Sequence, residues 1–265
     1  MAALALALRG EGMADDSPAP PDSTALARLA QETRATLNAA SRPGPLRVGE
    51  DLTFEVHFGM IHAGEAHLTI LDVQGPAGAR CYRLRSVARS TGFFGKLYDV
   101  NDRIDSRLDS LGLMSRAIEK SLHEGSYHHE QKVRFDYGAL RARYASGDTF
   151  DIPGPMQDDL SAFYVARCLD LRENTVFYLE THTNKVNYPM QVRVYGREVI
   201  QTELGDFQCL RVEPRVDRGG IFKARGGMML WLTADSRHLP VRMRSKLPVG
   251  SITADLIDIQ PGSAP

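Results

Sequence analysis

The 265-residue sequence lacks an excess of charge of either sign, because 32 Lys and Arg side chains stand against 33 Asp and Glu side chains. Such a balance provides no field that would attract nucleic acid or an anionic membrane. The sequence also lacks any uninterrupted apolar run of about 18 residues, the length that a membrane-spanning helix needs. We therefore predict neither a nucleic-acid-binding protein nor an integral membrane protein.

Cysteine is scarce as well. Cys81, Cys168 and Cys209 permit at most one internal disulfide, and the sequence leaves open whether one pair is bridged or all three thiols are free. No C-x-x-C pair, nucleophile elbow, P-loop, dinucleotide fingerprint or His-Glu-x-x-His stretch is present. The sequence therefore predicts a non-enzymatic protein with no catalytic residue, no metal ligand and no cofactor.

Asp235, Ser236 and His238 supply the residue types of a nucleophilic triad. Within four consecutive positions, however, these side chains cannot converge as a triad requires. Asp and Ser at such a place bond to nearby backbone amides, and Pro240 then begins the next strand. We interpret this stretch as a turn.

What the sequence does contain is a two-residue alternation of apolar and polar side chains from Glu50 onward. In the first strand Leu52, Phe54 and Val56 share one face, while Thr53 and Glu55 share the other. This period is typical of strands with one buried face. Further strands are predicted at Tyr82–Val87, Asn101–Leu108, Leu113–Glu124, Tyr127–Tyr137, Leu140–Ser146, Val176–Thr183, Tyr188–Tyr195, Phe207–Val216, Met228–Thr233, Pro240–Leu247 and Ser251–Ile259.

This succession predicts an all-β protein with minor α content, in which one large antiparallel sheet curls into an unclosed or spiral β-barrel. A short helix is expected near residues 160–169, with Asp158 and Asp159 at its N-terminus, where carboxylates meet unpaired amides. A second helix is expected at Thr24–Ala39. The predicted organisation is residues 1–21 as a disordered remnant of a signal segment, 22–48 as helix and linker, 49–260 as a single β domain and 261–265 as a tail.

The signal assignment comes from the Met1–Leu8 run, which resembles the end of a secretory apolar region but has no basic segment before it. We interpret it as a truncated signal sequence, with an unstructured native N-terminus as the alternative. The expected location is the periplasm.

Two groups of histidines come together in predicted hairpins. In one hairpin, Gly125-Ser126 is a two-residue turn signal that fixes which residues pair across the turn. In the other, residues 59–64 are expected to connect the first two strands and to bring His57 within reach of His67. His123 and His128 with Glu130 offer a conceivable metal site, but an exposed, solvated face is the interpretation we favour. The predicted register pairs His123 with His128, Glu124 with Tyr127, Glu119 with Lys132 and Ile118 with Val133.

The ordered set of strand and turn segments resembles the DUF3108 family of bacterial envelope proteins. The resemblance covers about Gly49 to Asp258 and implies export to the periplasm and an unclosed β-barrel like those of periplasmic lipoprotein carriers. It implies no activity and no catalytic residue. The segments that carry it are Gly49-Glu50-Asp51-Leu52, Gly59–Gly64, Asp158–Tyr164 with Arg167, Gly205-Asp206-Phe207, Trp231–Val241 and Gly250-Ser251-Ile252.

A wide curled sheet can leave an interior that side chains do not fill. Our leading hypothesis is therefore a periplasmic protein that binds an apolar or lipidic ligand, or a peptide, in cell-envelope maintenance, with the helix near 160–169 partly closing the groove. A Gly-rich loop around Phe222 and Lys223 is a second candidate contact with a lipid or its head group. The expected lining residues are Phe54, Val56, Leu68, Met190, Leu230 and Met243.

Two alternatives remain. An assembly factor would use the basic strand face of Arg242, Arg244 and Lys246 against an acidic envelope protein. A metal-dependent or hydrolytic enzyme would need ligands or a nucleophile, base and acid that converge only in the folded chain.

Overall fold

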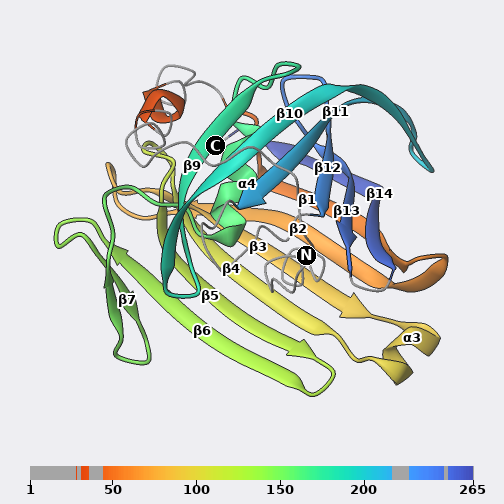
Figure 1. Ribbon diagram of the computed structural model, residues 1–265, viewed down its shortest axis with the longest axis horizontal. Helices are drawn as coiled ribbons and strands as arrows, with labels where there is room; N and C mark the ends of the chain where they lie inside the picture. Colours follow the sequence, from red (N-terminus) through yellow and green to blue (C-terminus); the bar gives the residue numbers. More distant parts are fainter. Residues whose placement is uncertain (1–27, 29–30, 36–43, 217–226, 248–249, 265) are drawn as a thin grey trace.

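A computed structural model of the protein describes residues 28, 31–35, 44–216, 227–247 and 250–264. In this part of the chain, fourteen strands form one antiparallel sheet that curls around a helix (Figure 1). The sheet runs in the spatial order β8-β7-β6-β5-β4-β3-β2-β1-β14-β13-β12-β11-β10-β9. The strands are β1 (Val48–Phe58), β2 (Ile61–Gln74), β3 (Cys81–Ser90), β4 (Asn101–Asp109), β5 (Ser115–Glu124), β6 (Tyr127–Asp136), β7 (Arg141–Tyr144), β8 (Thr149–Asp151), β9 (Val176–Thr183), β10 (Val186–Thr202), β11 (Gly205–Val216), β12 (Met228–Thr233), β13 (Pro240–Lys246) and β14 (Ser251–Ser263).

The predicted fold class is confirmed. Every strand neighbour within the sheet is antiparallel, and β8 and β9 are its two ends, so the barrel is not closed by strand pairing. Curvature comes from register shifts in the long strands, for example between Thr53 and Phe54 and between Val194 and Arg197. Such bulges bend a strand and increase its twist, which rolls a wide sheet onto itself.

The first hairpin differs from the prediction. β1 continues to Phe58 and β2 begins at Ile61, so the turn has two residues instead of spanning 59–64. As a result His57 pairs with His62, and His67 pairs with Thr53. The expected approach of His57 to His67 is wrong, because the two-residue turn at Gly59 and Met60 places His62, and not His67, opposite His57.

The β5–β6 hairpin, by contrast, has the predicted register. All four predicted pairs are present, including His123 with His128 and Ile118 with Val133. The Glu119 carboxylate and the Lys132 ammonium group are 2.8 Å apart. Gly125 has φ of 58°, the left-handed conformation that a two-residue turn requires. The two-residue turn was sufficient to predict the register because the β5–β6 pairing contains no register shift.

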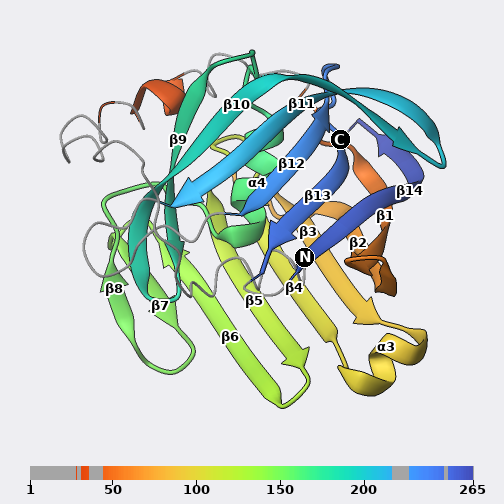
Figure 2. The ribbon, with the colours of Figure 1, turned by 45° about the vertical axis from the view of Figure 1, so that its right-hand side comes forward.

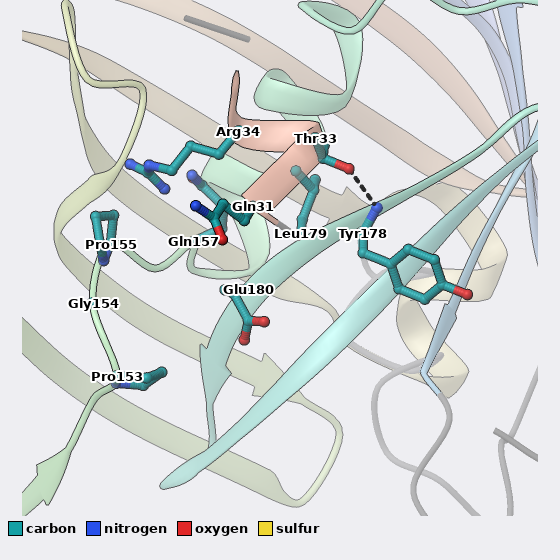
Figure 3. Close-up of a pocket in the computed structure, with 10 residues that line it drawn as sticks. All are labelled: Gln31, Thr33, Arg34, Pro153, Gly154, Pro155, Gln157, Tyr178, Leu179 and Glu180. Carbon is teal, nitrogen blue, oxygen red and sulfur yellow. Dashed lines mark hydrogen bonds between the residues drawn. The ribbon is translucent and has the colours of Figure 1, made fainter. Parts of the chain in front are cut away.

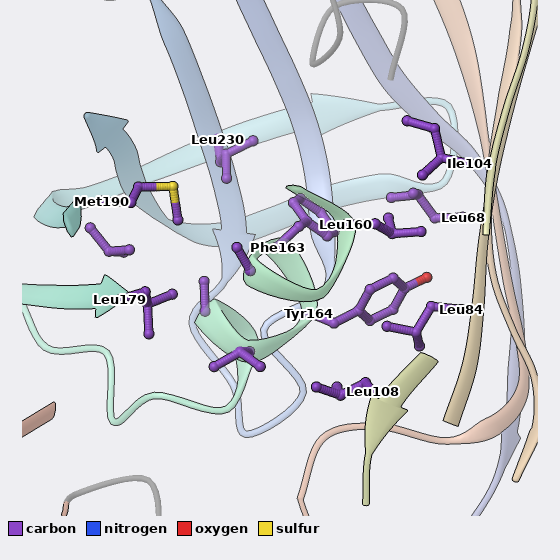
Figure 4. Close-up of a cluster of buried hydrophobic side chains, with 14 of the residues drawn as sticks. Leu68, Leu84, Ile104, Leu108, Leu160, Phe163, Tyr164, Leu179, Met190 and Leu230 are labelled. Atoms are coloured by element: carbon purple, nitrogen blue, oxygen red, sulfur yellow. The ribbon is translucent and has the colours of Figure 1, made fainter. Parts of the chain in front are cut away.

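Helix α4 (Asp159–Arg167) lies inside the curl, between β1–β5 on one side and β9–β12 on the other (Figure 2). All nine of its residues are buried. The sequence placed it across the opening of a groove, and that position is wrong: Leu160 and Phe163 pack on the sheet, and Ala162, Val165 and Ala166 leave no polar face for solvent. The helix is the centre of the core, as Figure 4 shows for Tyr164 against Leu84.

The two ends of the sheet meet beside α4. Gln157, which follows β8, forms a parallel bridge with Thr181 of β9. Tyr144 Oη lies 2.8 Å from His182 Nε2, and His182 Nδ1 lies 2.5 Å from Asn187 Oδ1. The Asn187 side chain also donates to the Asp151 carbonyl at 2.6 Å. We call these four residues, Tyr144, His182, Asn187 and Asp151, the seam; their hydrogen bonds add to the backbone bridge at Gln157 in holding the two ends of the sheet together.

Part of the predicted N-terminal helix is described, since residues 31–35 are helical. Thr33 Oγ1 accepts a hydrogen bond from the Tyr178 amide at 3.1 Å, so this helix covers the outer edge of β9. The predicted signal segment lies outside the described residues. No described helix is long and apolar enough to cross a membrane.

Candidate ligand-binding site

An apolar pocket of about 230 Å³ opens at one end of the sheet. Strands β1, β3 and β5 run toward this end and β2, β4 and β6 run away from it, and between β3 and β4 lies the short helix α3 (Gly92–Leu97). We call it the α3 end; it is at the lower right of Figure 1. The pocket is lined by Val56, Phe58, Ala63, Gly64, Glu65, Ala88, Arg89, Ser90, Phe94, Tyr98, Val100, Glu124, Leu247 and Ile252.

Aromatic rings form one wall of the pocket and join its elements. The Phe58 and Phe94 ring centroids are 6.1 Å apart, and those of Phe94 and Tyr98 are 6.5 Å apart. The Tyr98 ring also packs on the β5–β6 turn, because a Cβ added at Gly125 would lie 3.0 Å from its Cε2. Helix α3 is thus fastened to β1 and to the β5–β6 turn, and the wall is built from three separate connections.

The predicted lining residues divide into three groups. Val56 lies on the pocket. Phe222 and Lys223 lie outside the described residues. The other five belong to one buried cluster around α4, where Leu68, Met190 and Leu230 lie close to the helix (Figure 4); the full set is Phe54, Leu68, Met190, Leu230 and Met243.

The sequence did not predict most of the pocket, because its residues come from four connections that are distant in the chain. Phe58, Phe94 and Tyr98 are aromatic residues beside turns, which is a signal in the sequence, but nothing there predicts α3, since its six residues have no apolar period. Leu247 and Ile252 were placed in strands without any indication of the end on which they meet. Only the curl of the sheet brings β13 and β14 beside β3.

A buried ion cluster lies toward the other end of the barrel. The Arg167 guanidinium is bidentate to Glu50, at 2.7 and 3.1 Å, and both side chains are fully buried. Arg237 adds a third contact to Glu50 at 2.7 Å. Burial alone would lower the pKa of Arg167, but the Glu50 carboxylate more than offsets it and raises that pKa. This cluster ties α4 to β1 and to the β12–β13 turn.

The N-terminus of α4 carries a second buried polar group. Asp158 accepts hydrogen bonds from Leu160 and Ser161 amides at 2.9 and 2.8 Å, which confirms the predicted capping carboxylate. Its other oxygen accepts from Ser106 and Ser115 hydroxyls at 2.6 and 2.5 Å. Burial raises the pKa of Asp158. Asp159 accepts from Lys120 and Thr183, so every charge here has a partner within the fold.

A second cavity, of about 320 Å³, lies between the helical residues 31–35, the outer edge of β9 and the segment 153–157 (Figure 3). Arg34, Gln157 and Glu180 line it. Burial raises the pKa of Glu180 and lowers that of Arg34. The Arg34 guanidinium donates to the Gly112 carbonyl at 3.3 Å. Most of the lining surface of this cavity is apolar, but it also carries the charged groups of Arg34 and Glu180.

The histidine pairs do not form a metal centre. His123 and His128 meet edge to face, with centroids 4.0 Å apart, but Glu130 accepts a hydrogen bond from Ser121 on its own strand pair. Among the described residues no group of three or more His, Cys, Asp or Glu side chains is arranged to hold a metal ion.

The Asp235–His238 stretch is a turn, as predicted. Asp235 Oδ1 accepts from the amides of Arg237 and His238 at 3.0 and 3.2 Å. The His238 ring bonds the Arg167 carbonyl at 2.8 Å, which turns it toward the end of α4. Cys81, Cys168 and Cys209 are all free thiols.

The basic strand face is partly neutralised. Arg242 forms an ion pair with Asp255 on the neighbouring strand, and Arg244 donates to Thr253 Oγ1 at 3.2 Å. Lys246 is exposed, and the residue opposite it on β14 is Ser251, which carries no charge. An acidic partner therefore meets less free positive charge here than the sequence pattern indicated.

The profile of the DUF3108 family, described as a protein of unknown function, matches residues 53–257 of this sequence. The chain belongs to the DUF3108 family. That match begins within β1 and ends within β14, so it includes most of the curled sheet and α4. No curated protein has a sequence that matches this chain significantly.

Among solved structures, this DUF3108 chain is similar to a β-barrel-like protein of the DUF1849 domain family from Brucella abortus. The two share 9% identity with a TM-score of 0.54, over 81% of this chain and 98% of the other. A protein from Bacteroides fragilis, assigned as exported and with a YmcC-like fold, shares 12% identity with a TM-score of 0.39, over 82% of this chain and 98% of the other. The first likeness supports the β-barrel-like fold.

Proposed function

We propose that this DUF3108 protein is a non-enzymatic, exported protein of the periplasm that binds an apolar or lipidic ligand at the α3 end. The observation that carries the proposal is the apolar pocket of about 230 Å³ beside α3. Sites for drug-sized molecules occupy roughly 300–1,000 Å³. The pocket is smaller, which suits one hydrocarbon chain or one ring better than a whole lipid.

The rest of the interior also favours the α3 end as the place where a ligand binds. The five predicted lining residues away from the pocket pack around α4, and the buried Glu50–Arg167 pair lies toward the opposite end. A ligand that reached those residues would have to displace the helix, with loss of its buried contacts. The pocket at the α3 end can be occupied without such a change.

The test is to fill the pocket. Cis-parinaric acid, a fluorescent fatty acid, is titrated into the wild-type protein and into Val56→Trp, which places an indole in the pocket. The control is Val199→Trp, which adds the same ring at an exposed position of β10. We expect Val56→Trp to weaken the dissociation constant about tenfold or more, because it removes the burial of several methylene groups, and the control to leave it unchanged.

Equal affinity for wild type and Val56→Trp, or no saturable binding by wild type, would refute the pocket as the site. Organic extraction of the purified protein followed by mass spectrometry gives an independent reading. Recovery of an apolar molecule from wild type, and of less from Val56→Trp, is the expected result.

A further inference from the structure

Exposed apolar side chains gather at the α3 end. Of the twelve large apolar side chains that are exposed among the described residues, six lie on three connections there: the β1–β2 turn, the α3 connection and the β5–β6 turn. Met60 is 100% exposed, Phe93 73% and Leu97 71%. The six residues, which we call the rim, are Met60, Ile61, Phe93, Leu97, Tyr98 and Tyr127.

The rim is contiguous. Its three connections join six neighbouring strands, β1 to β6. Strands about 4.8 Å apart place the three tips within about 25 Å of one another. Tyr98 lies against Gly125 in the β5–β6 turn, and Phe94, in the same helix as Phe93, stacks toward Phe58 of β1. An apolar surface of this kind marks a binding site more often than chance exposure.

The charges on the rim favour a lipid surface over a charged partner. Within the three connections the described charged residues that face solvent are Lys96 and Asp99, one of each sign. There is thus no net charge to complement. Phe, Tyr and Leu side chains are those that enter the boundary between head groups and acyl chains.

The pocket is a second reason to expect a lipid surface at the rim. Phe94 and Tyr98 line it, and they belong to the same connection as Phe93 and Leu97. Its mouth therefore opens beside the rim. A chain that moves from a bilayer into the pocket along this route would pass from the rim to Phe94 and Tyr98, whose rings limit its contact with water.

We propose that the rim docks the protein on the surface of a lipid bilayer, with Phe93 and Leu97 inserted and the pocket mouth held against the lipid. This proposal rests on the proposed function, because a lipid ligand would come from a bilayer. The docking itself is measured separately from ligand binding.

The experiment is flotation of the full chain with vesicles of phosphatidylcholine, which carry no net charge. The test variant is Phe93→Ser/Leu97→Ser, and the matched control is Leu111→Ser/Leu140→Ser, two exposed apolar residues at the opposite end. We expect the test variant to lose about tenfold or more of its vesicle partitioning, because two apolar side chains no longer leave water. The control should partition like wild type, and raising salt to about 0.5 M should change little.

Several outcomes would overturn the proposal: no flotation of wild type, equal loss in the control, or release by salt. A rim variant that abolishes a wild-type dimer, detected by light scattering without lipid, would assign the surface to contact between copies instead. Cis-parinaric acid binding separates the two proposals. If the rim variant loses flotation but binds the fatty acid, both stand; if Val56→Trp floats but does not bind, docking stands on its own.

Discussion

At the scale of single residues, the most consequential interaction is the buried pair of Glu50 and Arg167. Their side chains are fully buried and 117 positions apart in the chain, and they connect the first strand to the end of the central helix. Taking two charges out of water costs several kcal/mol, which only close pairing offsets. Removing one of the two charges is therefore expected to destabilise the fold more than removing both.

Replacing Glu50 with Gln should lower the free energy of unfolding by about 3–5 kcal/mol, since Arg167 would keep a buried charge without its partner. The double variant Glu50→Leu/Arg167→Met should be more stable than Glu50→Gln, because no buried charge remains. The control is Arg237→Met, which removes a partly exposed contact and should cost below about 1 kcal/mol. Guanidinium unfolding curves measure all three, and a double variant less stable than the single one would contradict the argument.

Histidine pairing shows the limit of residue-level reasoning. His123 with His128 was correct because the Gly125-Ser126 turn specifies the register. His57 with His67 was wrong because the first hairpin turns at Gly59 and Met60, which places His62 opposite His57. The alternation in the two flanking strands does not show where between residues 59 and 64 the chain turns.

At the scale of elements, local sequence predicted where α4 begins but not where the helix lies in the fold. The sequence located its start correctly, since Asp158 caps the helix through two backbone amides. It did not predict that the same carboxylate also binds Ser106 and Ser115, which come from two strands of the wall. The cap therefore also anchors the helix inside the sheet.

Asp158→Ala should lower the free energy of unfolding by about 2–4 kcal/mol, the sum of a lost cap and of buried hydroxyls left without acceptors. Asp158→Asn should cost less, since Asn is an equally good capping residue and the two hydroxyls can accept from its amide. Chemical unfolding followed by circular dichroism measures both. Equal costs for Ala and Asn would show that burial of the carboxylate, and not its hydrogen bonds, governs the position.

At the scale of the whole molecule, the open barrel depends on the seam. His182 is buried, accepts from Tyr144 at Nε2 and donates from Nδ1 to Asn187, a network that a neutral imidazole satisfies completely. Burial lowers the pKa of His182, and Asp159 and Lys120 are the charged groups that act on it from α4 and β5. The ends of the sheet are thus fastened by a group that prefers to stay uncharged.

Because this pKa is lowered in the native state, the unfolded chain takes up a proton first as pH falls. The contribution of His182 is therefore complete above its ordinary pKa near 6.5 and decreases as pH falls below that value. We expect the unfolding free energy of wild type to decrease from pH 7.5 to pH 5 by more than that of His182→Gln. Hydrogen exchange at pH 5 should rise first in β7–β10, and equal pH slopes for both proteins would contradict the role of the seam.

The sequence by itself determined the period of the strands, most of their positions, the β5–β6 register and the capped start of α4. These features depend on neighbours a few residues apart, where alternation and turn chemistry are decisive. It also indicated the DUF3108 family through an ordered set of such local segments, which the match to residues 53–257 confirms.

Only the tertiary structure decided where the interior is full and where it is open. Helix α4 occupies the curl, so five of the predicted lining residues belong to the core, and the pocket lies where α3, β1, β13 and β14 meet at one end. The reason is physical: side-chain alternation states which face of a strand is buried, but the radius of the curl and the object that fills it depend on contacts between segments far apart in the chain.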